Sequence, residues 1–178
     1  VSALVSPVNF CAGTYDVVAT IENDGPNQLG NVKVAWSVDG TLQTGLTYSS
    51  TLDTMGGKGS NSANVKLGSL SFSAGVPKAI KIWTYSPNGV TDKDMSNDTL
   101  SIPDLQPAIS GSYTIDPSGS GSTNFKSWGA AAALLSKYGV CGPVSITVAP
   151  GTYNESVNLG AVAGTSAKNT ITIDGGDS

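Results

Sequence analysis

The feature that most constrains the fold is a repeated pattern of short runs in which apolar and polar residues alternate. From Val1 to about Ile102, turns rich in Gly, Asn, Asp and Pro separate these runs. Alternation with a period of two is typical of half-buried strands, and many short strands in succession favour a β-sandwich. The expected strands are Ala3–Val8, Tyr15–Glu22, Val32–Val38, Thr41–Tyr48, Ala63–Leu67, Ala79–Tyr85 and one near Thr99–Ile102.

The side chains of this first part predict a core between two layers. Alternate residues from Val32 to Val38 share one face of a strand, as do Ile80 and Ile82 in a later strand. We interpret the three tryptophans as core residues rather than as a platform for sugar rings. They are Trp36, Trp83 and Trp128.

A change of pattern near residue 103 predicts a second domain. The segment Ile102–Ala108 holds two prolines and has no clear periodicity, so we assign 1–102 to the sandwich, 103–110 to a linker and 111–178 to the second domain. The strands expected there are spaced like successive rungs of a parallel β-helix. They are Ser112–Ile115, Pro143–Val148, Glu155–Leu159 and Thr170–Asp174.

One helix is expected, at 124–137, where it would cap the β-helix. Ser122 or Thr123 can cap its amino end, the alanine-rich run favours a helix, and Gly139 is a stop signal. An apolar stripe along one side of the helix predicts that it packs on the sheet. The stripe consists of Phe125, Trp128, Ala132 and Leu135.

The charged residues exclude several classes of function. The chain has nine basic residues, all lysine, no histidine, and thirteen acidic residues, which give a formal charge of −4. Because Arg is the residue that grips phosphate bidentately, its absence argues against nucleic-acid binding. The lack of His removes the commonest general base and zinc ligand, so we expect no enzyme activity and no cofactor. The longest nearly apolar run, Gly129–Leu135, is too short to insert into a membrane as a helix.

Several segments of the first part resemble CARDB-like immunoglobulin folds. The resemblance is carried by an Asn-containing turn after the second strand and an Asn-rich ending before the last strand. The segments are Phe10–Tyr15, Ile21–Gly25, Trp36–Gly40 and Ser96–Leu100. The resemblance implies that residues 1–102 form an immunoglobulin-like β-sandwich.

The second part resembles the start of right-handed β-helices of the pectate-lyase-like type. The segments concerned are Gly111–Ile115, Gly139–Val144 and Pro150–Glu155. Large secreted and surface proteins of the Bacteroidetes join these two modules, so the resemblance implies an extracellular or cell-surface location in a bacterium. Lyases of this type work through acidic calcium ligands and a basic residue, usually Arg, which this chain lacks.

Two cysteines, Cys11 and Cys141, are the candidates for a disulfide. We place one in each domain, so a bridge would join the domains across the linker in an oxidising compartment. The alternative is two small buried thiols. Spacing in the sequence does not decide between them, because a bridge needs Cα atoms within about 7 Å.

Two groups of residues with side-chain oxygen atoms are candidate sites. Four oxygen ligands, Asp92, Asp94, Asn97 and Asp98, are weak candidates for calcium, with a solvated turn as the favoured interpretation. Asp174 and Asp177 could form a carboxylate pair of the glycosidase kind, but their sequence is that of an ordinary turn. We therefore expect no catalytic residues and no resident metal.

Two threonines are candidates for O-glycosylation. The segments Asp53–Met55 and Asp98–Leu100 resemble the acceptor pattern of the same bacterial group, which points to Thr54 and Thr99. The alternative is that Asp-Thr serves as a common turn dipeptide. A glycan at either position would decorate the surface without a catalytic role.

The chain is therefore expected to be a non-catalytic structural or adhesive module of a bacterial surface protein. Its partners would be other copies of itself, neighbouring domains of a larger surface protein, or glycans. The alternative is a carbohydrate-binding module of a secreted polysaccharide-active enzyme. If the chain ends at Ser178, the last rung has no cap, and we expect copies to associate head to tail into filaments.

Overall fold

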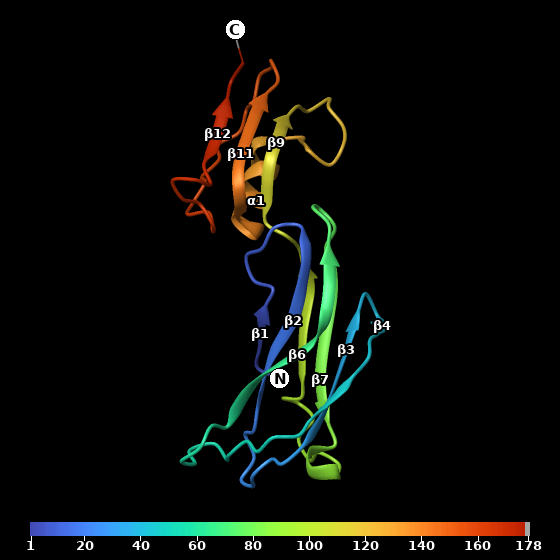
Figure 1. Cartoon of the computed structure of the whole chain (residues 1–178). Coiled ribbons are helices and arrows are strands. Elements are labelled where there is room, and N and C mark those ends of the chain that lie inside the picture. Colours follow the sequence, from blue (N-terminus) through green and yellow to red (C-terminus); the bar gives the residue numbers. More distant parts are fainter. Residues whose placement is uncertain (177–178) are drawn as a thin grey trace. The chain divides into compact units, whose positions relative to one another are not determined.

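The protein is mainly β and divides into two compact units, each described here by itself. The computed structural model describes residues 1–176 (Figure 1). The sandwich unit consists of Val1–Val8, Thr14–Phe72 and Pro77–Leu105, and the parallel-sheet unit of Asn9–Gly13, Ser73–Val76 and the chain from Gln106 onward. No helix within residues 1–176 has the length and apolar character needed to cross a membrane.

The sandwich unit is built from two sheets and a short 3-10 helix, Pro87–Gly89. The smaller sheet has the order β1-β2-β6, with bounds Ala3–Ser6, Gly13–Glu22 and Ser62–Phe72. The larger sheet has the order β4-β3-β7-β8, with β5 also paired to β3. Its strands are β3 (Val32–Val38), β4 (Thr41–Leu42), β5 (Leu46–Tyr48), β7 (Lys78–Tyr85) and β8 (Thr99–Leu105).

The core of this unit lies between the two sheets. Trp36 of the larger sheet reaches Gly68 of the smaller one so closely that a Cβ at Gly68 would lie 2.9 Å from the indole Cζ2 atom. Buried residues alternate along the strands, as the sequence predicts. Those that are almost fully buried are Val17, Ala19, Ile21, Val34, Ile80 and Ile82. The β-sandwich expected from the sequence is therefore present, and the immunoglobulin-like description fits its two layers.

Three features of this unit differ from the sequence prediction. The expected strand Thr41–Tyr48 is divided into β4 and β5, because its pairing with β3 shifts by one residue between them. In this gap the indole N–H of Trp36 donates to the Thr44 carbonyl at 3.1 Å. The strand expected at Ala63–Leu67 extends to Phe72. Trp83 is not a core residue, because the alternation that buries Ile82 turns Trp83 to the other face.

The parallel-sheet unit has four strands in the order β10-β9-β11-β12. Each neighbouring pair is parallel. The strands are β9 (Ile109–Ile115), β10 (Asn124–Phe125), β11 (Val140–Val148) and β12 (Ile171–Asp174). Figure 1 shows β9, β11 and β12 running side by side.

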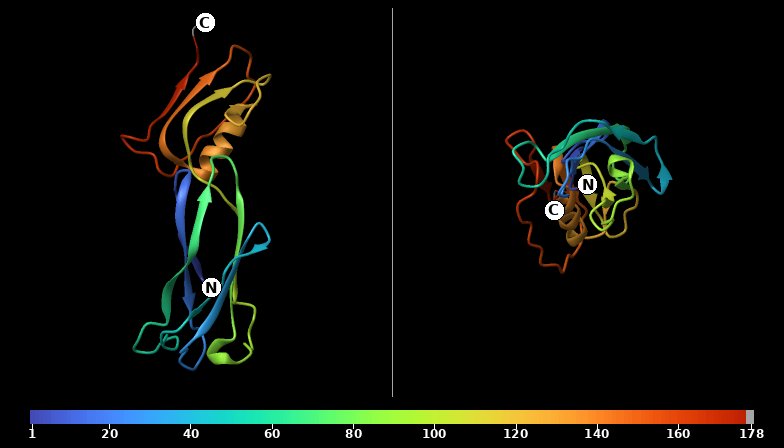
Figure 2. Two further views of the ribbon diagram at one scale, coloured as in Figure 1. Left: turned by 45° about the vertical axis from the view of Figure 1, so that its right-hand side comes forward. Right: turned by 90° about the horizontal axis from the view of Figure 1, so that it is seen from below.

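Helix α1 (Trp128–Tyr138) packs against one face of this sheet (Figure 2). Its buried residues Ala131 and Leu135 join a core cluster with Ile115, Val144 and Ile146. The helix begins later than expected from the sequence. Ser127 is the N-cap and its hydroxyl accepts from the Ala130 N–H at 3.1 Å, whereas Ser122 and Thr123 precede β10.

Two expectations for the second half of the chain are wrong, the linker 103–110 and the strand Glu155–Leu159. Strand β8 continues to Leu105 and β9 begins at Ile109, so most of the expected linker 103–110 is strand. The expected strand Glu155–Leu159 is irregular chain. Residues 106–176 therefore show one parallel sheet covered by a helix, which does not by itself confirm the expected β-helix segment.

Candidate functional site

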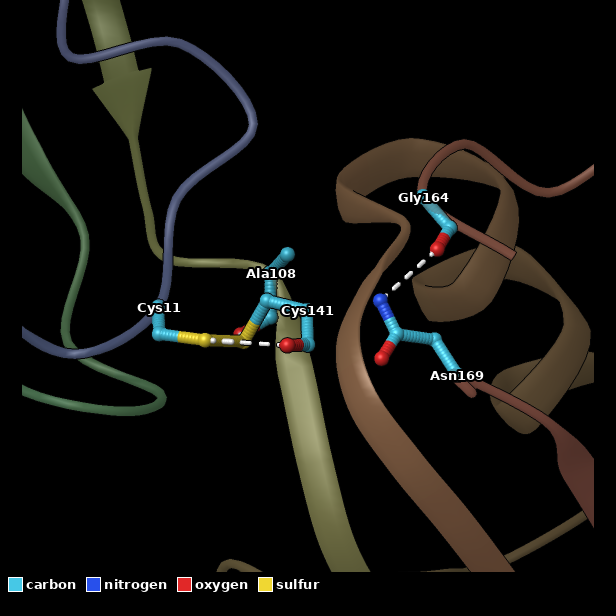
Figure 3. The surroundings of a disulfide bond; sticks show 5 residues. All are labelled: Cys11, Ala108, Cys141, Gly164 and Asn169. Carbon is cyan, nitrogen blue, oxygen red and sulfur yellow. Dashed lines mark hydrogen bonds between the residues drawn. A yellow bond between two sulfur atoms is a disulfide. The ribbon is translucent and has the colours of Figure 1, made fainter. Parts of the chain in front are cut away.

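The two cysteines form a disulfide in the parallel-sheet unit. Their Cα atoms are 5.4 Å apart, within the range that a disulfide requires. The Sγ atom of Cys11 lies 3.3 Å from the Cys141 carbonyl oxygen, and the Sγ atom of Cys141 lies 3.4 Å from the Ala108 carbonyl oxygen (Figure 3). The bridge joins positions separated by 130 residues in the sequence.

The segment Asn9–Gly13 is held in this unit by more than the disulfide. The Phe10 carbonyl accepts from the Ala108 N–H at 2.8 Å, and the Phe10 side chain is buried. This segment belongs to the parallel-sheet unit, although the chain on both sides of it belongs to the sandwich unit. The expectation that Cys11 and Cys141 lie in different domains is therefore wrong, because the chain between β1 and β2 leaves the sandwich unit.

Two glycines allow the chain to pack closely beside the bridge. Gly164 has φ +81°, and a Cβ there would overlap the Val140 carbonyl. Gly139 has φ +72°, and a Cβ there would lie 2.5 Å from the Ala163 carbonyl oxygen. The Asn169 side chain donates to the Gly164 carbonyl at 3.0 Å and fixes this corner (Figure 3). Only glycine combines a positive φ with such close backbone approach.

Glu155 caps the amino end of α1, a role that the sequence analysis missed. Its carboxylate accepts from the Trp128 N–H at 3.3 Å and the Gly129 N–H at 2.9 Å. A negative charge at this end satisfies free N–H groups and interacts favourably with the helix dipole. The separation of 27 residues between Glu155 and Trp128 explains why no local pattern indicated the contact.

The four calcium candidates do not converge on one point. Asp92 accepts from the Asp94 N–H at 2.9 Å, and Asp94 accepts from the N–H and hydroxyl of Ser96, which lowers the Asp94 pKa. Asp98 is buried and accepts from the Thr84 hydroxyl at 3.2 Å, and burial raises its pKa. Asn97 accepts through its backbone carbonyl from the amino group of Val1. Among residues 1–176, no group of three or more His, Cys, Asp or Glu side chains is arranged to hold a metal ion.

The other acidic candidates are Asp174 and Asp177. Asp174 accepts from the Gly176 N–H at 3.0 Å within a turn. Asp177 lies outside the described residues. Asp174 is therefore seen in the role of an ordinary turn residue.

The two glycosylation candidates lie in different surroundings. Thr54 is in a loop, where Asp53 accepts from the N–H groups of Gly59 at 2.7 Å and Thr54 at 2.8 Å. These hydrogen bonds hold the pKa of Asp53 below its usual range. Thr99 is exposed in strand β8, opposite Trp83. Modification of either threonine stays a prediction.

The outward side of the larger sandwich sheet gathers aromatic rings and lysines. Trp83 is partly exposed and Tyr85 is 42% exposed. The Nζ atom of Lys81 lies 5.8 Å from the centroid of the Trp83 ring, and that of Lys33 lies 5.7 Å from the centroid of the Tyr85 ring. We call these four residues the lysine–aromatic face. This face is not expected from the sequence if all three tryptophans are core residues, whereas of the three only Trp36 is fully buried.

Comparisons with known proteins concern the fold alone. No family model matches the chain, and no curated protein matches it. Two solved structures are similar to it. One is a domain of a Methanosarcina acetivorans protein described as a cell surface protein, with 22% identity and a TM-score of 0.46 over 58% of this chain and 86% of that chain. The other is the CARDB domain of a Pyrococcus furiosus protein in complex with di-metal ions, with 15% identity and a TM-score of 0.42 over 57% of this chain and 79% of that chain.

Proposed function

We propose that this chain is a non-catalytic structural or adhesive module of an extracellular bacterial surface protein. The observation that carries the proposal is the Cys11–Cys141 disulfide. Disulfides form and persist in oxidising compartments and are rare in the cytosol. Only 12% of the residues are charged, so the polar surface consists mainly of hydroxyl and amide side chains.

The position of the disulfide suits a module that bears force. Cys11 lies in the segment Asn9–Gly13 and Cys141 lies in β11, so the bridge lies within the parallel-sheet unit and joins residues 130 apart in the sequence. A covalent bond at this place keeps the segment Asn9–Gly13 joined to β11 when hydrogen bonds open. A structural or adhesive protein needs such a connection, whereas a catalytic role would need convergent reactive groups in a supported pocket.

The proposal is tested by measuring attachment and catalysis on the same protein. Beads coated with the purified chain should attach to bacterial or host surfaces above the level of albumin-coated beads. The chain should release no unsaturated product from polyuronides, with or without calcium. Attachment without product release supports the proposal. Release that scales with protein concentration would overturn the non-catalytic part, and attachment no better than that of albumin would overturn the adhesive part.

For assembly, we propose head-to-tail association through the edge of β12 with a second copy of the chain. Within residues 1–176, β12 pairs on one side only, with β11, and Ile173 is 49% exposed. An uncovered strand edge with an apolar side chain can pair with another strand. The strand would come from the sandwich unit of the neighbour, where β1 (Ala3–Ser6) is itself an edge strand.

Sedimentation of Ile173→Lys tests this contact. Association of the unmodified chain should rise with concentration and be lost in this variant. Val90→Lys is the control, because Val90 is 63% exposed in the sandwich unit and its replacement should leave association unchanged. Monomers at all concentrations would overturn the assembly proposal and would fit a β12 edge covered by a following coil of a β-helix.

The alternative, a carbohydrate-binding module, has one specific observation in its favour. The lysine–aromatic face places two rings and two ammonium groups on one side of a sheet. An adhesive module and a carbohydrate-binding module would both use such a surface to bind a glycan. The chemistry of that glycan follows from the charges around the rings.

A further inference from the structure

We propose that the lysine–aromatic face of the sandwich unit binds an acidic polysaccharide. The inference rests on the proposed adhesive function and names its ligand. The ligand would carry sugar rings that stack on Trp83 and Tyr85 and carboxylate or sulfate groups that pair with Lys33 and Lys81. Such a site combines apolar contact with charge pairing on one surface.

Strand pairing brings the four residues together. Lys33 on β3 is opposite Tyr85 on β7, and Ala35 is opposite Trp83. Residues opposite each other on a sheet lie about 5 Å apart and point to the same side. Along β7, Lys81, Trp83 and Tyr85 occupy alternate positions, so they form a row about 13 Å long on one side of the strand. A row of this length presents both rings to successive units of one polysaccharide chain.

The Trp83 ring lies where the sheet offers little bulk beside it. Its partner on β3 is Ala35, the smallest side chain in the row, and Ala35 is only 8% exposed although it points outward. The partner on β8 is Thr99, which is exposed. A partly exposed ring flanked by small side chains can offer one flat face to solvent, which suits the flat apolar face of a sugar ring.

The charges on this side of the sheet favour an anionic ligand. The outward positions that are paired between strands of the larger sheet hold no acidic residue, although the whole chain has a formal charge of −4. These positions, taken from the strand pairing, are Lys33, Ala35, Ser37, Leu42, Thr47, Lys81, Trp83, Tyr85, Thr99 and Ser101. Asp39, which follows β3 and pairs with Lys78, and Asp104 in β8 lie outside these positions. Of the ion pairs found within residues 1–176, one involves Lys66 and the other Lys78, so neither Lys33 nor Lys81 is neutralised by a carboxylate.

The lysines are also held close to the rings. Each ammonium group lies within about 6 Å of a ring centroid, the distance at which a cation is attracted to an aromatic face. The attraction places the positive charges beside the stacking surface before a ligand arrives. A neutral sugar would leave these charges unused, whereas an acidic polysaccharide would engage both rings and both lysines.

The inference is tested by affinity electrophoresis of the whole chain. The polymers used carry sugar rings, negative charges or both, so that the two contributions can be measured separately. Alginate supplies uronate carboxylates and dextran sulfate supplies sulfates, while neutral dextran shares its backbone with dextran sulfate. Polyglutamate supplies charge without sugar rings. We expect retardation by alginate or dextran sulfate, little by neutral dextran, and about tenfold weaker binding of polyglutamate. Which of the two acidic polymers binds better identifies the anionic group.

Variants assign the binding to this face. Trp83→Ala should weaken binding about tenfold, and the double variant Lys33→Ser/Lys81→Ser should remove most of its salt dependence. The control is Lys137→Ser, because Lys137 lies 4.9 Å from the Tyr138 ring centroid in the parallel-sheet unit and its loss removes a similar pair elsewhere. Thermal unfolding checks that each variant is folded, and the lysine variant tests the face even if Trp83→Ala is unstable.

The inference is overturned if no acidic polymer binds, if polyglutamate binds as tightly as the acidic glycans, or if the variants of this face bind like the unmodified chain. Failure of the inference is distinguishable from failure of the proposed function. Coated beads that still attach to surfaces while no acidic glycan binds would remove the ligand and leave the adhesive role.

Discussion

The two units of this protein bury their apolar residues in different ways. The sandwich unit closes its core between two sheets, and Val17, Ile80 and Ile82 are almost inaccessible to solvent. The parallel-sheet unit has one sheet, and burial on its inner side falls from Ile146 in β11 to the half-exposed Ile173 in β12. We therefore expect the second unit to depend more on a few individual contacts, which are the disulfide, the close backbone packing at Gly164 and the Glu155 cap of α1.

Replacement of a tryptophan in each unit should give the largest contrast. Trp36→Ala removes a buried indole that spans the sandwich, and we expect it to lower the free energy of unfolding by about 3–5 kcal/mol. Trp128 is only partly buried, in an edge-to-face contact with Tyr153, so Trp128→Ala should cost about 1–2 kcal/mol. Urea unfolding measures both. Equal losses would contradict the contrast between a closed and a partly open core.

Removal of the disulfide should have the next largest effect. The double variant Cys11→Ser/Cys141→Ser opens a covalent loop that spans 130 residues, and we expect a loss of about 2–5 kcal/mol. Urea unfolding of the variant and of the oxidised protein gives the difference. The control is the oxidised protein with added reductant, which should approach the variant. If the loss is negligible, the bridge is not a main support of the parallel-sheet unit.

Two glycine substitutions compare the glycine corner with a turn of the sandwich. Gly164 and Gly40 both have a positive φ, but a Cβ at Gly164 would overlap the Val140 carbonyl, whereas a Cβ at Gly40 meets nothing within 4 Å. Gly40→Ala should cost about 1 kcal/mol from the backbone alone. Gly164→Ala should cost at least about 1 kcal/mol more, since backbone atoms must also move. Thermal unfolding compares them, and equal losses would mean that the corner can relax.

The smallest expected effect concerns the pH dependence of the Asp53 loop. Hydrogen bonds from Gly59 and Thr54 lower the pKa of Asp53 in the folded state. Ionised Asp53 therefore stabilises the folded chain at pH values above its unfolded pKa of about 3.9. That contribution is lost as the pH falls through the lower folded value. Asp53→Asn should therefore destabilise the chain at neutral pH, and the difference should shrink below about pH 4. A stability difference between Asp53→Asn and the unmodified chain that stays constant from acidic to neutral pH would contradict this prediction.

Asp98 should change the pH dependence of stability in the opposite direction. Burial raises its pKa, so its ionisation costs stability, and the folded state gains relative to the unfolded state as the pH falls through the raised value. Asp98→Asn should flatten this dependence. Unfolding across the acidic range separates the two aspartates because their contributions change in opposite directions.

The sequence predicted the sandwich well because its strands carry their pattern locally. The bounds of Val32–Val38 were correct, and the alternation placed Trp36, Ile80 and Ile82 inside. The same alternation places Trp83 outside, since it directly follows Ile82, and the size of its aromatic side chain is a poor guide to burial at this position. The lysine–aromatic face could therefore have been found from the period-two pattern alone.

The parallel-sheet unit was harder to predict because its key contacts join distant residues. Glu155 reaches the start of α1, and the segment Asn9–Gly13 packs beside β11, neither of which a local pattern shows. The residues around Ser122 offered cap signals as good as that of Ser127, but pairing of Asn124–Phe125 with β9 delayed the helix. Tertiary contacts thus decided where these elements begin and end.

Our central proposal is an extracellular module closed by the Cys11–Cys141 bridge. Its most direct test is the state of those thiols in protein isolated from its natural source. The protein should be denatured without reductant, treated with an alkylating reagent and weighed by mass spectrometry. The account predicts that no thiol is labelled, and that two are labelled after reduction. Two labelled thiols before reduction would contradict the bridge and the extracellular location that rests on it.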